Sequence, residues 1–184
     1  MEENRRKVAI DLGKANVFSV VFILALLLIA VTAYFLLWPE QFAKETFRAM
    51  VQFDWMGPLI LMMTAGIVVH ELIHGLTWAC FAEGGWSTIK FGIVREHMTP
   101  YCHCNAPLSK SSYMTGAFMP CLVLGIIPTL LGFVFGSLLF LFFGLISIAS
   151  ATGDLWMMLL LRKEKSGSLI LDHPSEAGYY VIEN

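Results

Sequence analysis

The chain has 184 residues, of which 57% are hydrophobic and 14% are charged, and its mean hydropathy is +0.70. Soluble domains usually have about 45 to 50% apolar and about 25% charged residues, so this composition excludes an ordinary soluble domain and favours one that is embedded in a lipid bilayer. The formal net charge is only -2 and no basic stripe follows the sequence, which excludes nucleic acid as an expected partner.

In chain order, four apolar runs are long enough to cross a bilayer, which takes about 20 residues of helix. The first run has about 22 residues, whereas the hydrophobic part of a signal peptide has roughly 7 to 15, so we expect a retained helix. The sequence therefore predicts an all-α integral membrane protein with about four transmembrane helices, organised as a single membrane-embedded domain over residues 1–184. The expected spans are 17–38, 57–81, 113–135 and 137–161, followed by a tail at 162–184.

The basic residues indicate which way these helices run. Of the twelve Lys and Arg residues, only Lys44 and Arg48 lie between the first and second runs, and the other ten lie on the opposite side. Because loops rich in Lys and Arg stay in the cytoplasm, both termini are predicted to be cytoplasmic. The polar tail then lies at the cytoplasmic surface, and the residues around Gly136 form a tight external turn.

The largest stretch outside the predicted helices runs from Trp86 to Leu108. Its STIKFGIV segment mixes β-branched and aromatic residues, and Thr99 to Pro107 can return as a second strand. We expect a small cytoplasmic hairpin or re-entrant element between the second and third helices. Cys102, His103 and Cys104 lie here, but a structural zinc site needs four ligands and no second ligand pair is nearby, so a structural role is favoured.

Ionisable residues are costly inside a bilayer, by roughly 2.5 to 3.5 kcal/mol each on insertion scales, so each one calls for a function. Within the four runs, the only Asp, Glu, Lys, Arg or His residues are His70, Glu71, His74 and Asp154. Two imidazoles and two carboxylates without a basic partner are what a site for a divalent cation requires. An HExxH pattern arises by chance in many sequences, and its position inside an apolar run is what favours metal binding here.

The spacing of these residues indicates their roles. His70 and His74 are four residues apart, so both lie on one face of a helix and can bind one zinc ion, with Glu71 beside them as general base for the activated water. A catalytic zinc usually has three protein ligands, and Asp154 is the candidate for the third. From the expected helix ends, His74 and Asp154 both lie roughly 10 Å from the cytoplasmic side.

The motifs VVHELIHGL, YCHCNAPLS, SATGD and DHPSEAGYYV, in this order, resemble the putative zincin membrane peptidases, small bacterial proteins related in motif order to site-2 proteases. The resemblance covers most of the chain from the first span onward. It implies that His70, His74 and Asp154 bind Zn²⁺ and that Glu71 is the catalytic acid/base. One departure is that site-2 proteases commonly carry the aspartate in an Asn-Pro-Asp-Gly context, whereas here it stands in Thr-Gly-Asp-Leu.

The resemblance further implies a zinc-dependent intramembrane endopeptidase of the bacterial cytoplasmic membrane, whose substrates are membrane proteins or peptides cut in or near transmembrane segments. The hairpin between Trp86 and Leu108 would lie over the site and hold an unwound substrate at a strand edge. His103 and Asn105 would either donate hydrogen bonds to the developing oxyanion or stabilise the loop. Two alternatives stay open: a membrane protein that binds or transports metal without catalysis, and an inactive protease-like module that binds membrane segments.

Overall fold

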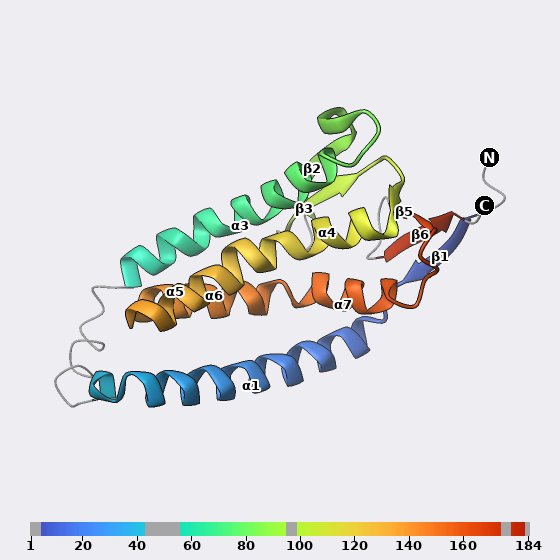
Figure 1. The fold of residues 1–184 in the computed structure, drawn as a ribbon. Helices are drawn as coiled ribbons and strands as arrows, with labels where there is room; N and C mark the ends of the chain where they lie inside the picture. The colour runs from blue at the N-terminus through green and yellow to red at the C-terminus, as the bar shows by residue number, and fades with distance from the viewer. Residues whose placement is uncertain (1–4, 43–55, 95–98, 174–177, 183–184) are drawn as a thin grey trace. The chain divides into compact units, whose positions relative to one another are not determined.

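The computed structural model describes residues 5–42, 56–94, 99–173 and 178–182 (Figure 1). By its internal contacts the chain divides into two compact units. Unit 1 comprises Met1–Asn16, Ile67–Pro120 and Gly153–Asn184, and unit 2 comprises Val17–Gly66 and Cys121–Thr152. Lys44 and Arg48, on which the predicted orientation depends, lie outside the described residues.

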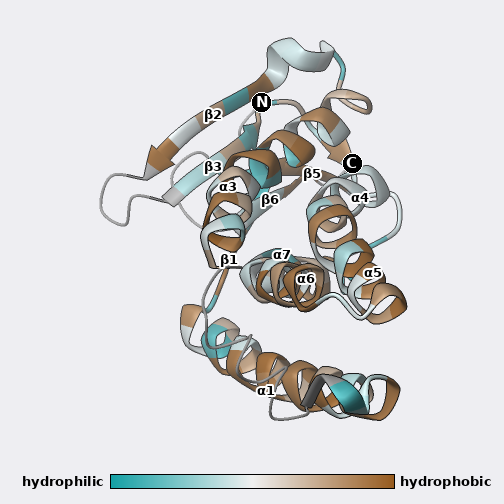
Figure 2. Cartoon of the chain, turned by 90° about the vertical axis from the view of Figure 1, so that its left-hand side faces the viewer, coloured by the Kyte–Doolittle hydropathy of each residue, from teal (hydrophilic) through white to brown (hydrophobic). Residues whose placement is uncertain are grey.

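The long apolar helices are close to the predicted spans. Among the described residues, α1 (Leu12–Leu37), α3 (Met56–Ala79) and the helix over Lys110–Phe135 are each long and apolar enough to cross a membrane. A fourth span is present if α6 (Leu138–Ser150) and α7 (Thr152–Leu161), which are bent by 46°, are taken together. Figure 2 shows that apolar residues predominate along these helices, and many face outward, such as Leu28 at 71% exposure and Leu61 at 72%. Lipid-facing side chains have this pattern.

Two helix boundaries differ from the prediction for local reasons. Helix α1 begins at Leu12 instead of residue 17, because the Asp11 carboxylate accepts a hydrogen bond of 3.1 Å from the Lys14 amide and caps the helix. The third span is divided into α4 (Lys110–Pro120), the π-helix η3 (Cys121–Ile126) and α5 (Ile127–Phe135). The π-helical turn follows Pro120, whose ring removes one N–H from the helical ladder.

In unit 2, glycines let helices α5 and α6 approach closely. A Cβ on Gly132 would lie 2.6 Å from the Leu141 amide nitrogen, and a Cβ on Gly144 would lie 2.5 Å from that of Thr129. Small residues at such contacts are typical of helix packing in membranes. The tight turn expected near Gly136 is present, with that glycine at φ +62°.

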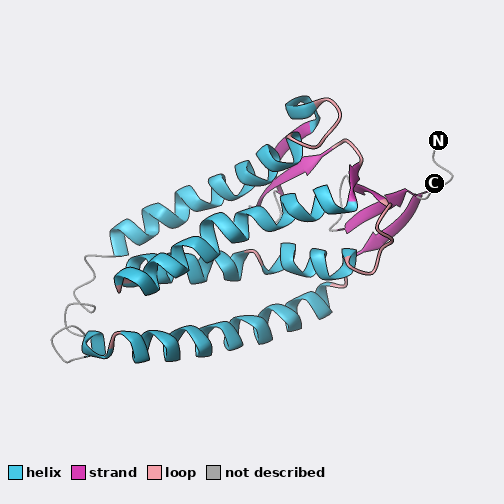
Figure 3. Cartoon of the chain, viewed as in Figure 1, coloured by secondary structure: helices cyan, strands magenta, loops and turns pink. Residues whose placement is uncertain are grey.

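Two antiparallel sheets lie in unit 1, so the expectation of an all-α fold needs correction (Figure 3). Strands β2 (Ile89–Val94) and β3 (Thr99–Cys104) form the hairpin that the sequence predicts. A second sheet has the order β1-β6-β5-β4, and the tail that we expected to be a plain surface segment contributes two of its strands. Its members are β1 (Arg5–Ala9), β4 (Leu108–Ser109), β5 (Leu169–Asp172) and β6 (Gly178–Ile182).

The core of unit 1 joins the helix ends to both sheets. Its buried side chains come from α3, α4 and α7 and from strands of both sheets, among them Trp78, Tyr113, Leu161, Ile170 and Tyr179. The β1–β6 pairing adds the N-terminal strand to the C-terminal one, with Arg5 opposite Ile182. This core therefore fixes the ends of the three helices whose polar residues are described next.

Candidate metal centre

Helix α3 presents the two histidines on one face. His70 Nε2 lies 3.2 Å from His74 Nε2, and the ring centroids are 4.8 Å apart at 75°. This is the geometry that a four-residue helical spacing predicts, because residues i and i+4 lie above one another. His74 is buried and His70 is partly buried.

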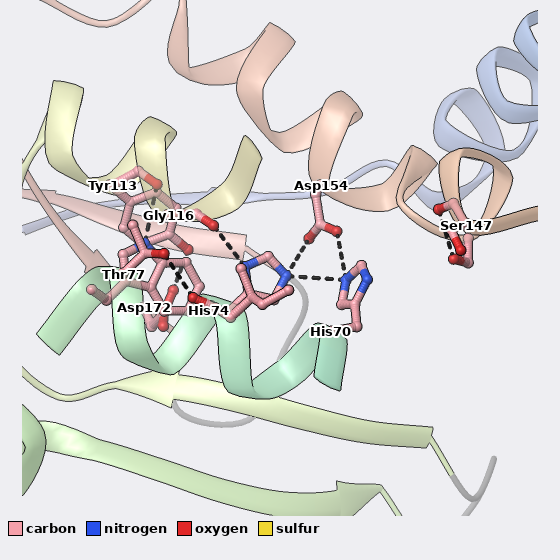
Figure 4. A network of polar contacts seen from close by, with 11 residues as sticks. His70, His74, Thr77, Tyr113, Gly116, Ser147, Asp154 and Asp172 are labelled. Carbon is pink, nitrogen blue, oxygen red and sulfur yellow. Dashed lines mark hydrogen bonds and ion pairs between the residues drawn. The ribbon is translucent and has the colours of Figure 1, made fainter. Parts of the chain in front are cut away.

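Asp154 meets both histidines from another helix of the same unit. The chain breaks at Ala151 between α6 and α7, and Asp154 lies in the first turn of α7. Its Oδ2 lies 3.2 Å from His70 Nε2, and its Oδ1 lies 3.5 Å from His74 Nε2 (Figure 4). The structure thus brings together the three residues that the sequence singles out as metal ligands.

These three side chains fit a zinc ion. In a tetrahedral zinc site with ligands about 2.0 to 2.2 Å from the metal, the ligand atoms lie roughly 3.3 to 3.6 Å from one another. The two imidazole nitrogens, 3.2 Å apart, are close to this range, and each Asp154 oxygen lies near one of them, Oδ2 at 3.2 Å from His70 Nε2 and Oδ1 at 3.5 Å from His74 Nε2. Within the part of the chain that the structure describes, this is the one group of three or more His, Cys, Asp or Glu residues close enough to share an ion. Two imidazoles and one carboxylate are also a donor set that suits zinc.

A backbone carbonyl orients His74. Its Nδ1–H donates a hydrogen bond of 2.8 Å to the Gly116 carbonyl on α4, which leaves the Nε2 lone pair directed at the site. The Trp78 ring stacks on His74 with centroids 5.0 Å apart and planes 15° apart. Sequence reasoning missed both contacts. A main-chain acceptor has no residue signature, whereas Trp78, four residues after His74 on the same helix, could have been found from helical spacing.

Glu71 lies beside this group and is not one of its three members. Its carboxylate interacts electrostatically with His70, His74 and Asp154, and the backbone N–H of Cys102 on β3 interacts with it from the hairpin. The hairpin also contacts α3 at Gly75, where an added Cβ would lie 2.6 Å from Phe91 Cζ and 3.2 Å from Cys102 Sγ. Gly75 therefore accommodates the hairpin against the helix that holds the histidines.

A second polar cluster, around Asp172 in β5, explains much of the YCHC and DHP motifs. Asp172 Oδ2 accepts a hydrogen bond of 2.9 Å from the Cys104 amide, and Oδ1 accepts one from the Tyr113 hydroxyl. His103 Nδ1 lies 3.5 Å from Oδ2, which favours the loop-stabilising role of His103 over an oxyanion contact. Burial raises the pKa of the Asp172 carboxyl above its ordinary value, although the hydrogen bonds oppose this.

The two hairpin cysteines are thiols in a buried environment. Burial raises the pKa of Cys102, and the neighbouring Glu71 and Asp172 carboxylates add to this. Burial likewise raises the pKa of Cys104. These shifts favour the neutral thiol at both residues, which agrees with the structural role that the sequence favours.

Together, the mostly helical fold and the His-His-Asp group define a helical protein with a candidate zinc centre. A family model described as "Putative zincin peptidase" matches residues 63–169, which is more than half of the chain. The chain belongs to this family, which confirms the resemblance seen in the sequence, and membership indicates a zinc metallopeptidase. The matched residues include the HELIH motif and Asp154 and end before Asp172. No curated protein and no solved structure matched the chain.

Proposed function

We propose that this protein is a zinc-dependent intramembrane endopeptidase that hydrolyses peptide bonds in or near transmembrane segments of other proteins. The observation that supports it best is the convergence of two imidazoles and a carboxylate, all within 4.8 Å of one another, from two apolar helices. Polar groups in such helices are costly, and a shared cation offsets that cost. Family membership supports the peptidase activity, and the apolar helices support its place in the bilayer.

In this proposal, His70, His74 and Asp154 hold the zinc ion. When bound, zinc acts as a Lewis acid that polarises the scissile carbonyl and makes water a better nucleophile at neutral pH. Glu71 accepts the proton of the attacking water and later donates it to the leaving amine. The Gly116 carbonyl keeps His74 in the tautomer whose Nε2 faces the ion.

The site lies near one end of its helices, which admits water. His74 is five residues before the end of α3 at Ala79, and Asp154 is seven before the end of α7 at Leu161. At 1.5 Å per residue, His74 and Asp154 lie roughly 8 and 10 Å from these helix ends. The two depths are therefore slightly less equal than the sequence predicts. The β1–β6 pairing places both ends of the chain in one sheet, which supports our proposal that both termini are on the cytoplasmic side of a bacterial membrane.

Strand β2 supplies an edge on which a substrate can be held extended. The Asn105 amide donates to the Thr88 carbonyl, which makes this pair a hydrogen-bonded one in the hairpin register. By the alternation of an antiparallel ladder, the N–H groups of Ile89, Phe91 and Ile93 then point away from β3. We propose that an unwound substrate segment pairs with these groups as an added strand.

The decisive experiment compares the wild type with Glu71→Gln, both purified in detergent. We expect about one zinc per chain in each protein, and cleavage of a transmembrane reporter by the wild type only. A metal transporter would lose no function on this change beyond some metal affinity, and an inactive module would cleave nothing in either form. If the wild type takes up no zinc, the His-His-Asp group is held together by a proton and the proposal is wrong.

The edge-strand role is tested with Ile93→Pro, which removes an outward N–H without breaking a hydrogen bond to β3. Ile93 is 58% exposed, so its side chain contributes little to the core. We expect cleavage to fall at least tenfold with zinc content unchanged, while the matched control Ile93→Thr, which keeps the N–H, cleaves normally. Equal turnover of both variants would exclude β2 as the substrate edge.

A further inference from the structure

Asp172 is a buried carboxylate that the proposed mechanism does not use. It ends strand β5, and its side chain is 10% exposed. Its contacts within the described part of the chain are to a tyrosine, a backbone amide and a histidine, and none is to Lys or Arg. A buried carboxylate is expensive when its ion-pair partner is a histidine, which is charged only if protonated, so its retention here calls for a role.

The first branch of its hydrogen bonds leads to His74. Asp172 Oδ1 accepts the Tyr113 hydroxyl, and the Tyr113 carbonyl accepts a hydrogen bond of 3.1 Å from Trp78 Nε1. Trp78 in turn stacks on the His74 ring. Gly116, whose carbonyl accepts the His74 Nδ1–H, lies one helical turn after Tyr113 on α4. Holding Tyr113 therefore fixes both groups that orient this histidine.

The second branch leads to Glu71. Asp172 Oδ2 accepts the Cys104 amide at 2.9 Å, which attaches β5 to β3. Two residues earlier on the same strand, Cys102 lies against α3, with its Sγ 3.2 Å from where a Cβ on Gly75 would be, one turn after Glu71, and its amide acts electrostatically on the Glu71 carboxylate. Residues i and i+2 of a strand face the same way, so the two amides point from β3 in the same direction. The carboxylate of Asp172 therefore fixes the strand that presents an amide to the general base.

We propose that Asp172 is a positioning residue that sets the orientation of His74 through Tyr113 and the position of Glu71's amide partner through Cys104. The inference rests on the proposed function, because it assigns roles to His74 and Glu71. It extends the site to the C-terminal sheet, beyond the residues that the family model matches. One carboxylate thereby couples a metal ligand to the acid/base.

The test uses four variants of the full chain in detergent: Asp172→Asn, Tyr113→Phe, the double variant that combines these two changes, and the control Tyr179→Phe. Asparagine keeps the shape of Asp172 but replaces one acceptor oxygen by a donor. Tyr179 is also a buried tyrosine and lies directly opposite Asp172 on β6, but its hydroxyl lies 3.4 Å from Glu164, which belongs to neither branch. The readouts are zinc affinity, the visible spectrum of the Co²⁺-substituted protein, and kcat and KM for a transmembrane reporter.

We expect Asp172→Asn and Tyr113→Phe to weaken zinc binding about 10- to 100-fold and to change the Co²⁺ spectrum, as losses of outer hydrogen bonds to metal ligands do. In Asp172→Asn, kcat should fall more than in Tyr113→Phe, because only the former also disturbs the Glu71 branch, and KM should change little in both. The double variant should be less impaired than the product of the single effects. Tyr179→Phe should match the wild type.

Three results would overturn the inference: a wild-type Co²⁺ spectrum and zinc affinity in both test variants, strictly independent effects in the double variant, or an equal loss in Tyr179→Phe. The last would show a general packing effect of the sheet. Failure of the proposed peptidase activity is separate, since it appears as a wild type that binds zinc and cleaves nothing, while the metal readouts still decide the role of Asp172. A wild type that takes up no zinc would overturn both proposals.

Discussion

Gly75 is the position where a single added methyl group tests the contact between the histidine helix and the hairpin. In Gly75→Ala, the new Cβ would lie 2.6 Å from Phe91 Cζ, 3.0 Å from Ile89 Cγ2 and 3.2 Å from Cys102 Sγ. Carbon atoms in contact prefer about 3.5 to 4.0 Å, so the hairpin must move away from α3 by up to roughly 1 Å. Part of this is avoided if the Phe91 ring, which is half exposed, turns aside.

The effect on stability should be small while the effect on catalysis should be large. Overpacking costs typically about 1 to 3 kcal/mol, and alanine in place of glycine within a helix returns up to about 1 kcal/mol. With the full gain of about 1 kcal/mol, the net change in the free energy of unfolding is a loss of about 0 to 2 kcal/mol. A displacement near 1 Å of catalytic groups can reduce turnover about 100-fold. Because Cys102 faces Glu71, we expect kcat to fall between about 10- and 100-fold with zinc retained.

The assay compares zinc content, thermal unfolding and cleavage of a transmembrane reporter in Gly75→Ala and in Gly66→Ala. The second variant makes the same change on the same helix, where the added Cβ would lie 3.3 Å from Phe143 and would need a shift of only a few tenths of an ångström. Adding Phe91→Ala to Gly75→Ala removes the closest atom and should restore part of the turnover. Normal cleavage by Gly75→Ala, or no restoration in the double variant, would refute the idea that the hairpin's position governs Glu71.

Two further predictions concern residues around the site. In Gly116→Ala the new Cβ would lie 2.0 Å from Trp78 Nε1, so we expect weaker zinc binding and a lower melting temperature. The control Gly153→Ala adds a Cβ beside Asp154 with nothing within 4 Å, so it should bind zinc normally. Equal zinc affinity of the two variants would contradict this prediction. The raised pKa of Asp172 means that the folded protein binds this proton more tightly than the unfolded chain. The proton on Asp172 therefore stabilises the folded protein fully below the ordinary pKa of 3.8, and this contribution is lost as the pH rises through the folded pKa. In Asp172→Asn the contribution is absent, so the melting temperature should depend less on pH just above 3.8 than in the wild type.

The parts of the fold that depend on local composition could be predicted from the sequence. The long apolar runs yield helices because a buried or lipid-facing backbone must satisfy its own hydrogen bonds. The hairpin follows from the β-branched and aromatic run Ile89–Val94 and its return at Thr99–Cys104. The closeness of His70 and His74 follows from helical periodicity alone, and Asp154 stands out because charge is rare in such helices.

The parts that depend on contacts between distant segments could not be predicted. Strand β1 has the sequence RRKVA, which lacks a strand-like apolar alternation, and it forms because the C-terminal strand β6 offers it an edge. The Gly116 carbonyl belongs to the main chain, so no side chain in the sequence indicates its role. The link from Asp172 to Tyr113 joins residues 59 apart, and the sequence indicates only that the DHP motif is polar.

Asp154 shows how a sequence without the Asn-Pro-Asp-Gly context can bring an aspartate to two histidines. In the Asn-Pro-Asp-Gly context, a proline just before the aspartate would interrupt the helix, because it lacks an N–H. Here the interruption is at Ala151, and the hydroxyls of Ser150 and Thr152 donate to the carbonyls of Ser147 and Ala149, each at 2.9 Å. Small and hydroxyl-bearing residues thus supply the break that proline would supply. Asp154 then lies in the first turn of the new helix, where the helix dipole favours a negative charge, and its two oxygens reach both histidines.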